Sequence, residues 1–208
     1  MFKNNPDQKY MVFDVESFGL YGEGFAYGYV VIDGMGKIYE ERLCSCNMNT
    51  TFEGEFISHE LHVGAYTGDA WFDSVMDDRD WLDMNIPCLD EVPNHIGFED
   101  PKALRKDFLQ QLKRLRAEGV ELIGDCIYPV ETNFIAKAFE DVVIETIDDS
   151  PFIYDINLLQ KMEGLHLPFL ESELPQHNPL NDAKQSARVF VNLLHGRSDM
   201  ELTRMVGE

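Results

Sequence analysis

Two carboxylates end an apolar stretch near the start of the chain. In YMVFDVES, Asp14 and Glu16 stand one residue apart and follow Val12 and Phe13. Side chains alternate along a strand, so both acids would point to the same face. Two carboxylates so close repel each other, and burial raises their pKa values. No Lys or Arg occurs between residues 10 and 36. A hard divalent cation such as Mg²⁺ or Mn²⁺ is therefore the simplest partner for these oxygen ligands.

A second pair of reactive residues lies near the other end of the chain. His177 stands five residues before Asp182, in HNPLND. Asp182 falls in the first turn of a predicted helix, where a carboxylate also suits the helix dipole. Each residue alone has an ordinary explanation, as a solvated acid, a helix cap or an exposed histidine. Together with Asp14 and Glu16 they form a set that points to metal-dependent chemistry.

The elements that carry these residues can be predicted from the pattern of the chain. The pattern predicts a first strand over 8–17, a hairpin turning at 33–36, helices over 99–119, 128–141 and 181–196, a buried strand over 120–126, and extended or mixed elements over 141–147 and 152–159. Residues of about 47–99 lack a clean period and are predicted to be an insertion of loops and short helices. The order predicts one α/β domain over residues 1–208, with a mixed sheet and helices on its faces.

The predicted helix over 99–119 has clear start and stop signals. Asp100 can cap it, Pro101 suits its first turn, and Gly119 can end it. An apolar stripe at helical spacing would face the core: Leu104, Phe108, Leu112 and Leu115.

Charge and composition narrow the range of functions. The chain has 208 residues, 17 basic and 38 acidic, and a formal net charge of −21. Such a surface repels long polyanions, which excludes a protein that coats duplexes without sequence preference. The polar start and the absence of a bilayer-length apolar run predict a soluble cytoplasmic protein with no membrane partner. The four cysteines form no CxxC pair and are expected to be reduced thiols.

The two motifs resemble those of DEDDh-type 3′–5′ exonucleases, whose fold is ribonuclease-H-like. The first motif of that family looks like D-x-E-T-T-G-L, and here DVESFGL runs from Asp14 to Leu20. The third is H-x4-D, and here HNPLNDA runs from His177 to Ala183. The sister subclass needs a tyrosine where this chain has Asn178. The resemblance covers about residues 8–197, with 47–99 unmatched, and implies a mixed five-stranded sheet.

The middle motif departs from the family pattern, H-N-x-x-F-D. The segment here is GDCIYPVETNFI. Counting back from Phe134 and Ile135, the metal-binding Asp position of the family motif falls on Glu131. This alignment requires a one-residue insertion and an Asp-to-Glu change. Residue type favours Asp125, at the end of a predicted strand, where ligands often bind in α/β sheets. Both alternatives stay open, with a slight preference for Glu131.

The resemblance implies a two-metal hydrolysis of phosphodiester bonds. Two Mg²⁺ or Mn²⁺ ions would lie among the acids, with Asp14 bridging both and Glu16 and Asp182 holding the ion that activates water. His177 would act as general base. The product would be a nucleoside 5′-monophosphate from a 3′ end. Residues after the first acid pair would contact the terminal nucleotide: Ser17, Phe18, Gly19 and Leu20.

Several alternatives remain at this stage. The acidic balance favours short single-stranded 3′ ends, of DNA or RNA, and related domains suggest a homodimer as one option. The altered middle motif would also suit a catalytically weakened module that binds nucleic acid or a partner protein. A phosphodiesterase for small nucleotides and a purely structural acidic protein are the other two readings.

Overall fold

The structure is a computed structural model that describes residues 5–17, 22–46, 95–142, 152–165, 167–173 and 178–196. Their elements are, in order, β1 (Lys9–Ser17), β2 (Gly24–Asp33), β3 (Ile38–Cys46), β4 (His95–Phe98), α5 (Pro101–Ala117), β5 (Glu121–Gly124), α6 (Val130–Asp141), β6 (Ile153–Asp155), α7 (Ile156–Glu163), the 3-10 helix η2 (Glu171–Glu173) and α8 (Pro179–His195). None of the helices in these ranges has both the length and the apolar character that a membrane crossing requires.

The strands form one mixed sheet in the order β4-β3-β2-β1-β5-β6. β2 lies antiparallel between β1 and β3, whereas β4, β5 and β6 each pair in parallel with a neighbour. The predicted α/β class, with helices on a mixed sheet, is confirmed, and the strand order is consistent with a ribonuclease-H-like fold.

Two details of the prediction are wrong. The sheet has six strands, not five, because β4 pairs in parallel with Leu43–Cys46 of β3. The predicted insertion therefore cannot extend to residue 99, since 95–98 belong to the sheet. A four-residue segment, HIGF, is too short to show a strand period, and its conformation is set by pairing with the edge of β3. The expected element over 141–147 lies outside the described residues beyond Val142.

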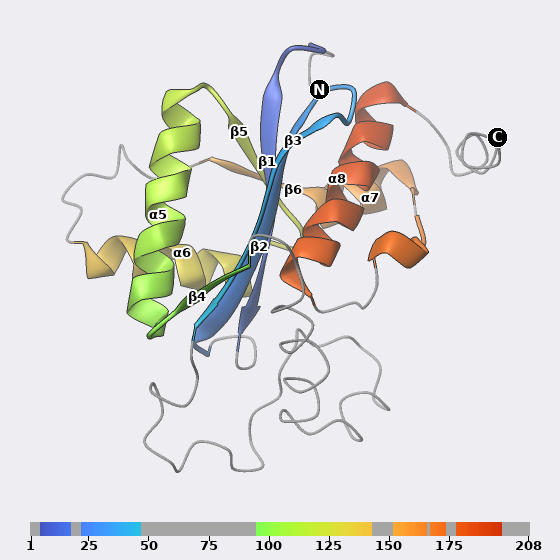
Figure 1. The fold of residues 1–208 in the computed structure, drawn as a ribbon. Coiled ribbons are helices and arrows are strands. Elements are labelled where there is room, and N and C mark those ends of the chain that lie inside the picture. The colour runs from blue at the N-terminus through green and yellow to red at the C-terminus, as the bar shows by residue number, and fades with distance from the viewer. Residues whose placement is uncertain are drawn as a thin grey trace, which may run out of the picture.

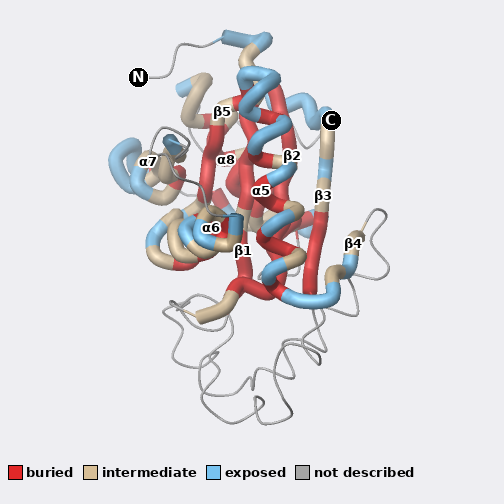
Figure 2. Tube along the Cα trace, turned by 90° about the vertical axis from the view of Figure 1, so that its left-hand side faces the viewer, coloured by how far each residue is buried: buried red, intermediate tan, exposed pale blue. Residues whose placement is uncertain are grey.

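The two faces of the sheet carry separate cores. Tyr10 and Val12 of β1 pack towards α8, and the ring of Tyr10 meets that of Phe190 edge-on at 4.7 Å between centroids. Met11 and Phe13 point the other way, towards α5, where the ring centroids of Phe13 and Phe108 lie 5.5 Å apart. Figure 1 shows α5 and α6 on one side of the sheet and α7 and α8 on the other, and Figure 2 shows the buried strands between them.

The hairpin and α5 form as their sequences predict. In the turn after β2, the side chain of Asp33 accepts hydrogen bonds from the backbone N–H groups of Met35 and Lys37, at 2.8 and 3.0 Å. At the start of α5, Asp100 accepts from the N–H of Ala103 at 2.8 Å, so it is the predicted cap. The apolar stripe of this helix is buried at all four predicted positions: Leu104, Phe108, Leu112 and Leu115.

Candidate metal centre

The alternation of β1 places its two acids on the α8 side of the sheet. Tyr10 and Val12 face α8, and Asp14 and Glu16 continue the same even-numbered row towards the carboxyl end of the strand. Glu16 is only 4% exposed, and Asp14 is half-buried. The local sequence explains this position, because Phe13 and Val15 are buried in the opposite core and hold the strand in register.

The first turn of α8 supplies the third carboxylate. Asn178 caps the helix, since its Oδ1 accepts from the backbone N–H groups of Leu180 and Asn181 at 3.1 and 3.4 Å. Pro179 occupies the first helical position, which its fixed φ suits. Asp182 follows within the same turn, as the sequence predicts.

A glycine allows this turn to approach the sheet. Gly28 of β2 pairs with Asp14 of β1, so it lies directly beside the first acid. A Cβ at Gly28 would lie 2.3 Å from the backbone N of Leu180 and 2.5 Å from the C of Pro179. No larger residue fits there unless the helix moves. The backbone of α8 therefore packs directly on Gly28 at Pro179 and Leu180, and Asp182 follows Leu180 by two residues.

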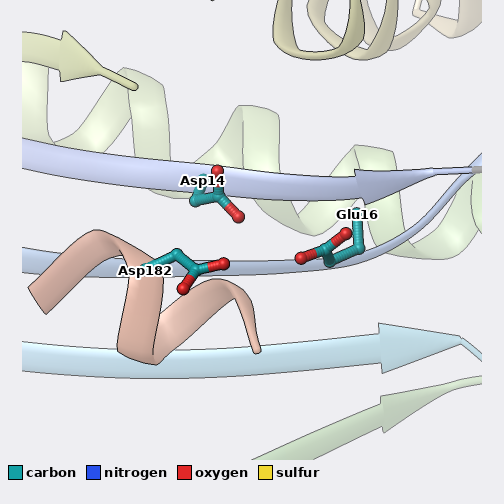
Figure 3. A group of neighbouring side chains, drawn as sticks. All are labelled: Asp14, Glu16 and Asp182. Atoms are coloured by element: carbon teal, nitrogen blue, oxygen red, sulfur yellow. The ribbon is translucent and has the colours of Figure 1, made fainter. Parts of the chain in front are cut away.

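Asp14, Glu16 and Asp182 form a compact acidic triad. Each offers one carboxylate oxygen, and these oxygens all lie within 4.8 Å of one another. Figure 3 shows the three side chains directed into the space between β1 and α8. The structure thus brings together acids from both ends of the chain, as the sequence predicted.

The electrostatics of the triad are those of a site that needs a cation. Burial raises the pKa of Asp14 well above its usual value, and the charges of Glu16 and Asp182 raise it further. The pKa of Glu16 is raised well above its usual value in the same way, by burial first and then by Asp182 and Glu131. In the described part of the chain, no Lys or Arg forms an ion pair with Asp14, Glu16 or Glu131.

The donor set fits a hard divalent metal. Three carboxylates within reach of one ion match the oxygen ligands and the charge that Mg²⁺ and Mn²⁺ prefer. A bound cation would also offset the repulsion that raises the pKa values of Asp14 and Glu16. The triad can therefore hold a metal, and the candidates for further ligands are its nearest acidic neighbours.

Those neighbours are Glu131 and Asp125, the two alternatives from the sequence. Glu131, in the first turn of α6, is 3% exposed, and its charge raises the pKa values of both Asp14 and Glu16. Its pKa is raised to about 8, mainly by burial and then by the charge of Asp125. Asp125 follows β5, and its charge acts on Asp14 more weakly than that of Glu131 and is not among the causes that shift the pKa of Glu16. Glu131 is thus more closely coupled to the triad.

The other predicted site residues are only partly described. Ser17 ends β1 and is 5% exposed, so its hydroxyl is not an open surface group. Its predicted contact with the substrate stays a prediction. Four further residues lie outside the described ranges: Phe18, Gly19, Leu20 and His177.

No protein-family model matches the chain, and a search among curated proteins found no match either.

Proposed function

We propose that the protein is a metal-dependent 3′–5′ exonuclease that hydrolyses single-stranded DNA or RNA ends and releases nucleoside 5′-monophosphates. The observation that supports this most is the convergence of Asp14, Glu16 and Asp182, from β1 and α8, with oxygens within 4.8 Å of one another. The motif resemblance around the same three residues adds the reaction class.

In this proposal the chain supplies ligands, orientation and a base. Asp14, Glu16 and Asp182 bind the metal, and Glu131, whose charge acts on both Asp14 and Glu16, joins the ligand set. Divalent ions, when bound, supply a nucleophilic water at neutral pH and neutralise charge on the scissile phosphate. His177 is proposed to accept the proton of that water, since an imidazole is largely neutral near pH 7.

The charge of the chain narrows the substrate. With a net charge of −21, the surface opposes a long polyanion at distances up to the Debye length, about 8 Å at physiological salt. Bound divalent ions would create a local positive region at one edge of the sheet only. A short single-stranded end that reaches this region meets less repulsion than a duplex lying across the surface.

The direct test is hydrolysis of short 5′-labelled DNA and RNA oligonucleotides with Mn²⁺ or Mg²⁺. The proposal expects stepwise shortening from the 3′ end, mononucleotide products with a 5′-phosphate, and loss of both in Asp14→Asn. Asp7→Asn is the matched control, because Asp7 is an exposed acid close to the opposite end of β1. Activity that needs no metal, or that survives in Asp14→Asn, would contradict the proposal.

The same assay separates the alternatives. A blocked 3′ end stops an exonuclease, whereas an enzyme for small nucleotides still cleaves its own substrate. Binding of an oligonucleotide without any Mn²⁺-dependent release of mononucleotides would favour a catalytically weakened module that binds nucleic acid.

A further inference from the structure

Helix α6 carries Glu131 on its buried face, on the side of the sheet opposite to α8 (Figure 1). Glu131 shares the spacing of the buried apolar residues of this helix, since Phe134 and Ile135 stand three and four positions after it. A carboxylate at such a position costs free energy unless a partner compensates for its burial. A metal ion in the acidic triad is such a partner only if α6 is held close to the end of β1.

The N-cap of α6 offers no capping side chain. Pro129 occupies that position, and its ring has no oxygen to accept from the N–H groups of the first turn. The position of Glu131 therefore depends on how the rest of α6 packs. A Cβ at Gly24 would lie 2.4 Å from Cδ2 of Phe134, so the helix packs directly against the start of β2.

The two residues before β2 are held by side chains of α5 and α6. The carbonyl oxygen of Gly22 accepts from Nδ2 of Asn133 at 3.1 Å and from Nζ of Lys137 at 3.3 Å. The carboxylate of Glu23 pairs with Lys137 at 3.6 Å and with Arg105 of α5. Asn133 and Lys137 stand four residues apart, so they share one face of α6. We call these contacts of Gly22 and Glu23 the α6 clamp.

A buried arginine extends the α6 clamp to the other end of the helix. Besides its pair with Glu23, Arg105 donates from Nε to the carboxylate of Asp141, the last residue of α6, at 2.7 Å. The helix is thus tied to the start of β2 directly through Asn133 and Lys137, and indirectly through Arg105. It cannot shift along the sheet without breaking these bonds.

The α6 clamp lies at the end of the sheet where the metal centre lies. Glu16 of β1 pairs with Ala26 of β2. Ser17 pairs with Gly24, which directly follows the clamped segment. One short stretch of β2 therefore contacts both the strand that carries two acids of the triad and the helix that carries the next acid.

We propose that Asn133 and Lys137 are positioning residues of the metal centre, which hold Glu131 within reach of the ion that the acidic triad binds. The inference rests on the proposed function, because it takes Glu131 as a ligand of that ion. It explains why a helix on the far face of the sheet from α8 supplies a carboxylate to the same centre.

A double-mutant cycle with Glu131 tests this in the absence of nucleic acid. Mn²⁺ affinity is measured by calorimetric titration, at a temperature where circular dichroism shows each variant to be folded. The variant that combines Asn133→Ala with Lys137→Met should bind Mn²⁺ about 10-fold more weakly, as is usual when the support of a metal ligand is lost. In the Glu131→Gln background the same two changes should alter the affinity by no more than about 2-fold, because no carboxylate remains there to be positioned.

Two control variants separate positioning from general stability. Lys137→Arg keeps a cationic donor beside Gly22 and Glu23, so it should bind Mn²⁺ nearly as tightly as the unaltered protein. Arg114→Met removes an ion pair of 2.6 Å between α5 and Glu40 of β3, and it should leave the affinity for Mn²⁺ unchanged.

An equal loss of affinity with and without Glu131→Gln would overturn the inference, since the α6 clamp would then act on the whole centre rather than on Glu131. Unchanged affinity in the combined variant, or an equal loss in Arg114→Met, would overturn it too. Failure of the proposed nuclease function would show separately, as Mn²⁺ binding without hydrolysis of oligonucleotides.

Discussion

The contact between Gly28 and α8 allows a test of how the metal centre is positioned. In Gly28→Ala, the added Cβ would stand 2.3 Å from the backbone N of Leu180 and 2.6 Å from its Cα. Ordinary contact begins at 3.4 Å, so the helix and the strand must separate by about 1 Å. The obstacles are backbone atoms, which no rotamer change can move aside.

The expected effect has two parts of different origin. Overpacking of this kind costs about 1–3 kcal/mol of folding stability. The displacement also carries Asp182, two residues after Leu180, away from Asp14, the residue opposite Gly28 in the sheet. We expect Mn²⁺ affinity to fall about 10- to 100-fold, as is usual when the support of a metal ligand is lost. Turnover should fall about 100-fold, as for a 1 Å misplacement of catalytic groups.

Mn²⁺ affinity is measured by electron paramagnetic resonance at a temperature where each variant is folded, as judged by circular dichroism. Gly34→Ala is the matched control, because its Cβ would meet the backbone O of Asn5 at 2.7 Å, near the opposite end of α8. Both variants should lose stability, but only Gly28→Ala should lose affinity for Mn²⁺. Saturating Mn²⁺ should restore part of its activity.

The reasoning is refuted if folded Gly28→Ala binds Mn²⁺ as tightly as the unaltered protein. An equal loss of affinity in Gly34→Ala would also refute it, since general destabilisation would then explain both.

Three further outcomes are expected. Asp14→Asn should raise the melting temperature of the metal-free protein by removing carboxylate repulsion, and should abolish stabilisation by Mn²⁺; a lower melting temperature without metal would argue against that repulsion. The folded-state pKa of Glu131 is raised from 4.5 to about 8, so the folded protein binds a proton there that the unfolded chain releases. The free energy of unfolding of the metal-free protein should therefore fall as pH rises from about 4.5 to about 8, as measured by urea denaturation. Bound Mn²⁺ should make this fall smaller. Glu131→Gln should weaken Mn²⁺ binding by about 10-fold or more and Asp125→Asn by less, because the charge of Glu131 acts on Asp14 more strongly than that of Asp125 does. Calorimetric titration that shows the reverse order would make Asp125 the middle ligand.

The parts of the site that follow from periodicity could be predicted from the sequence. Asp14 and Glu16 share a face because the strand period is two. Asp182 falls in the first turn of α8 as predicted, although the helix begins at Pro179, two residues before the predicted start at residue 181. These are local patterns, which a sequence displays directly. The convergence of Asp182 with the other two acids was implied only by the motif resemblance, and it depends on the packing of α8 against β1.

The remaining features depend on contacts that leave no periodic signal. β2 contains Gly24 and Gly28, and nothing in GFAYGYVV indicates which of them a helix touches. β4 owes its conformation to the edge of β3 rather than to its own four residues. The choice between Glu131 and Asp125 depends on how the chain turns between β5 and α6, where residue type and register pointed to different residues.

The triad also explains why binding a metal and folding should be linked in this chain. Without a cation, Asp14 and Glu16 are held together by the surrounding packing, and their raised pKa values show that the charged forms oppose this arrangement. A metal that binds only the folded state adds RT ln(1 + [M]/Kd), about 2.7 kcal/mol at a concentration 100-fold above Kd. The two hydrophobic cores must therefore be stable enough to hold the acids in place before the metal binds. On the α8 side of the sheet, the packing of Tyr10, Val12 and Phe190 provides this stability, next to the acids that it holds in place.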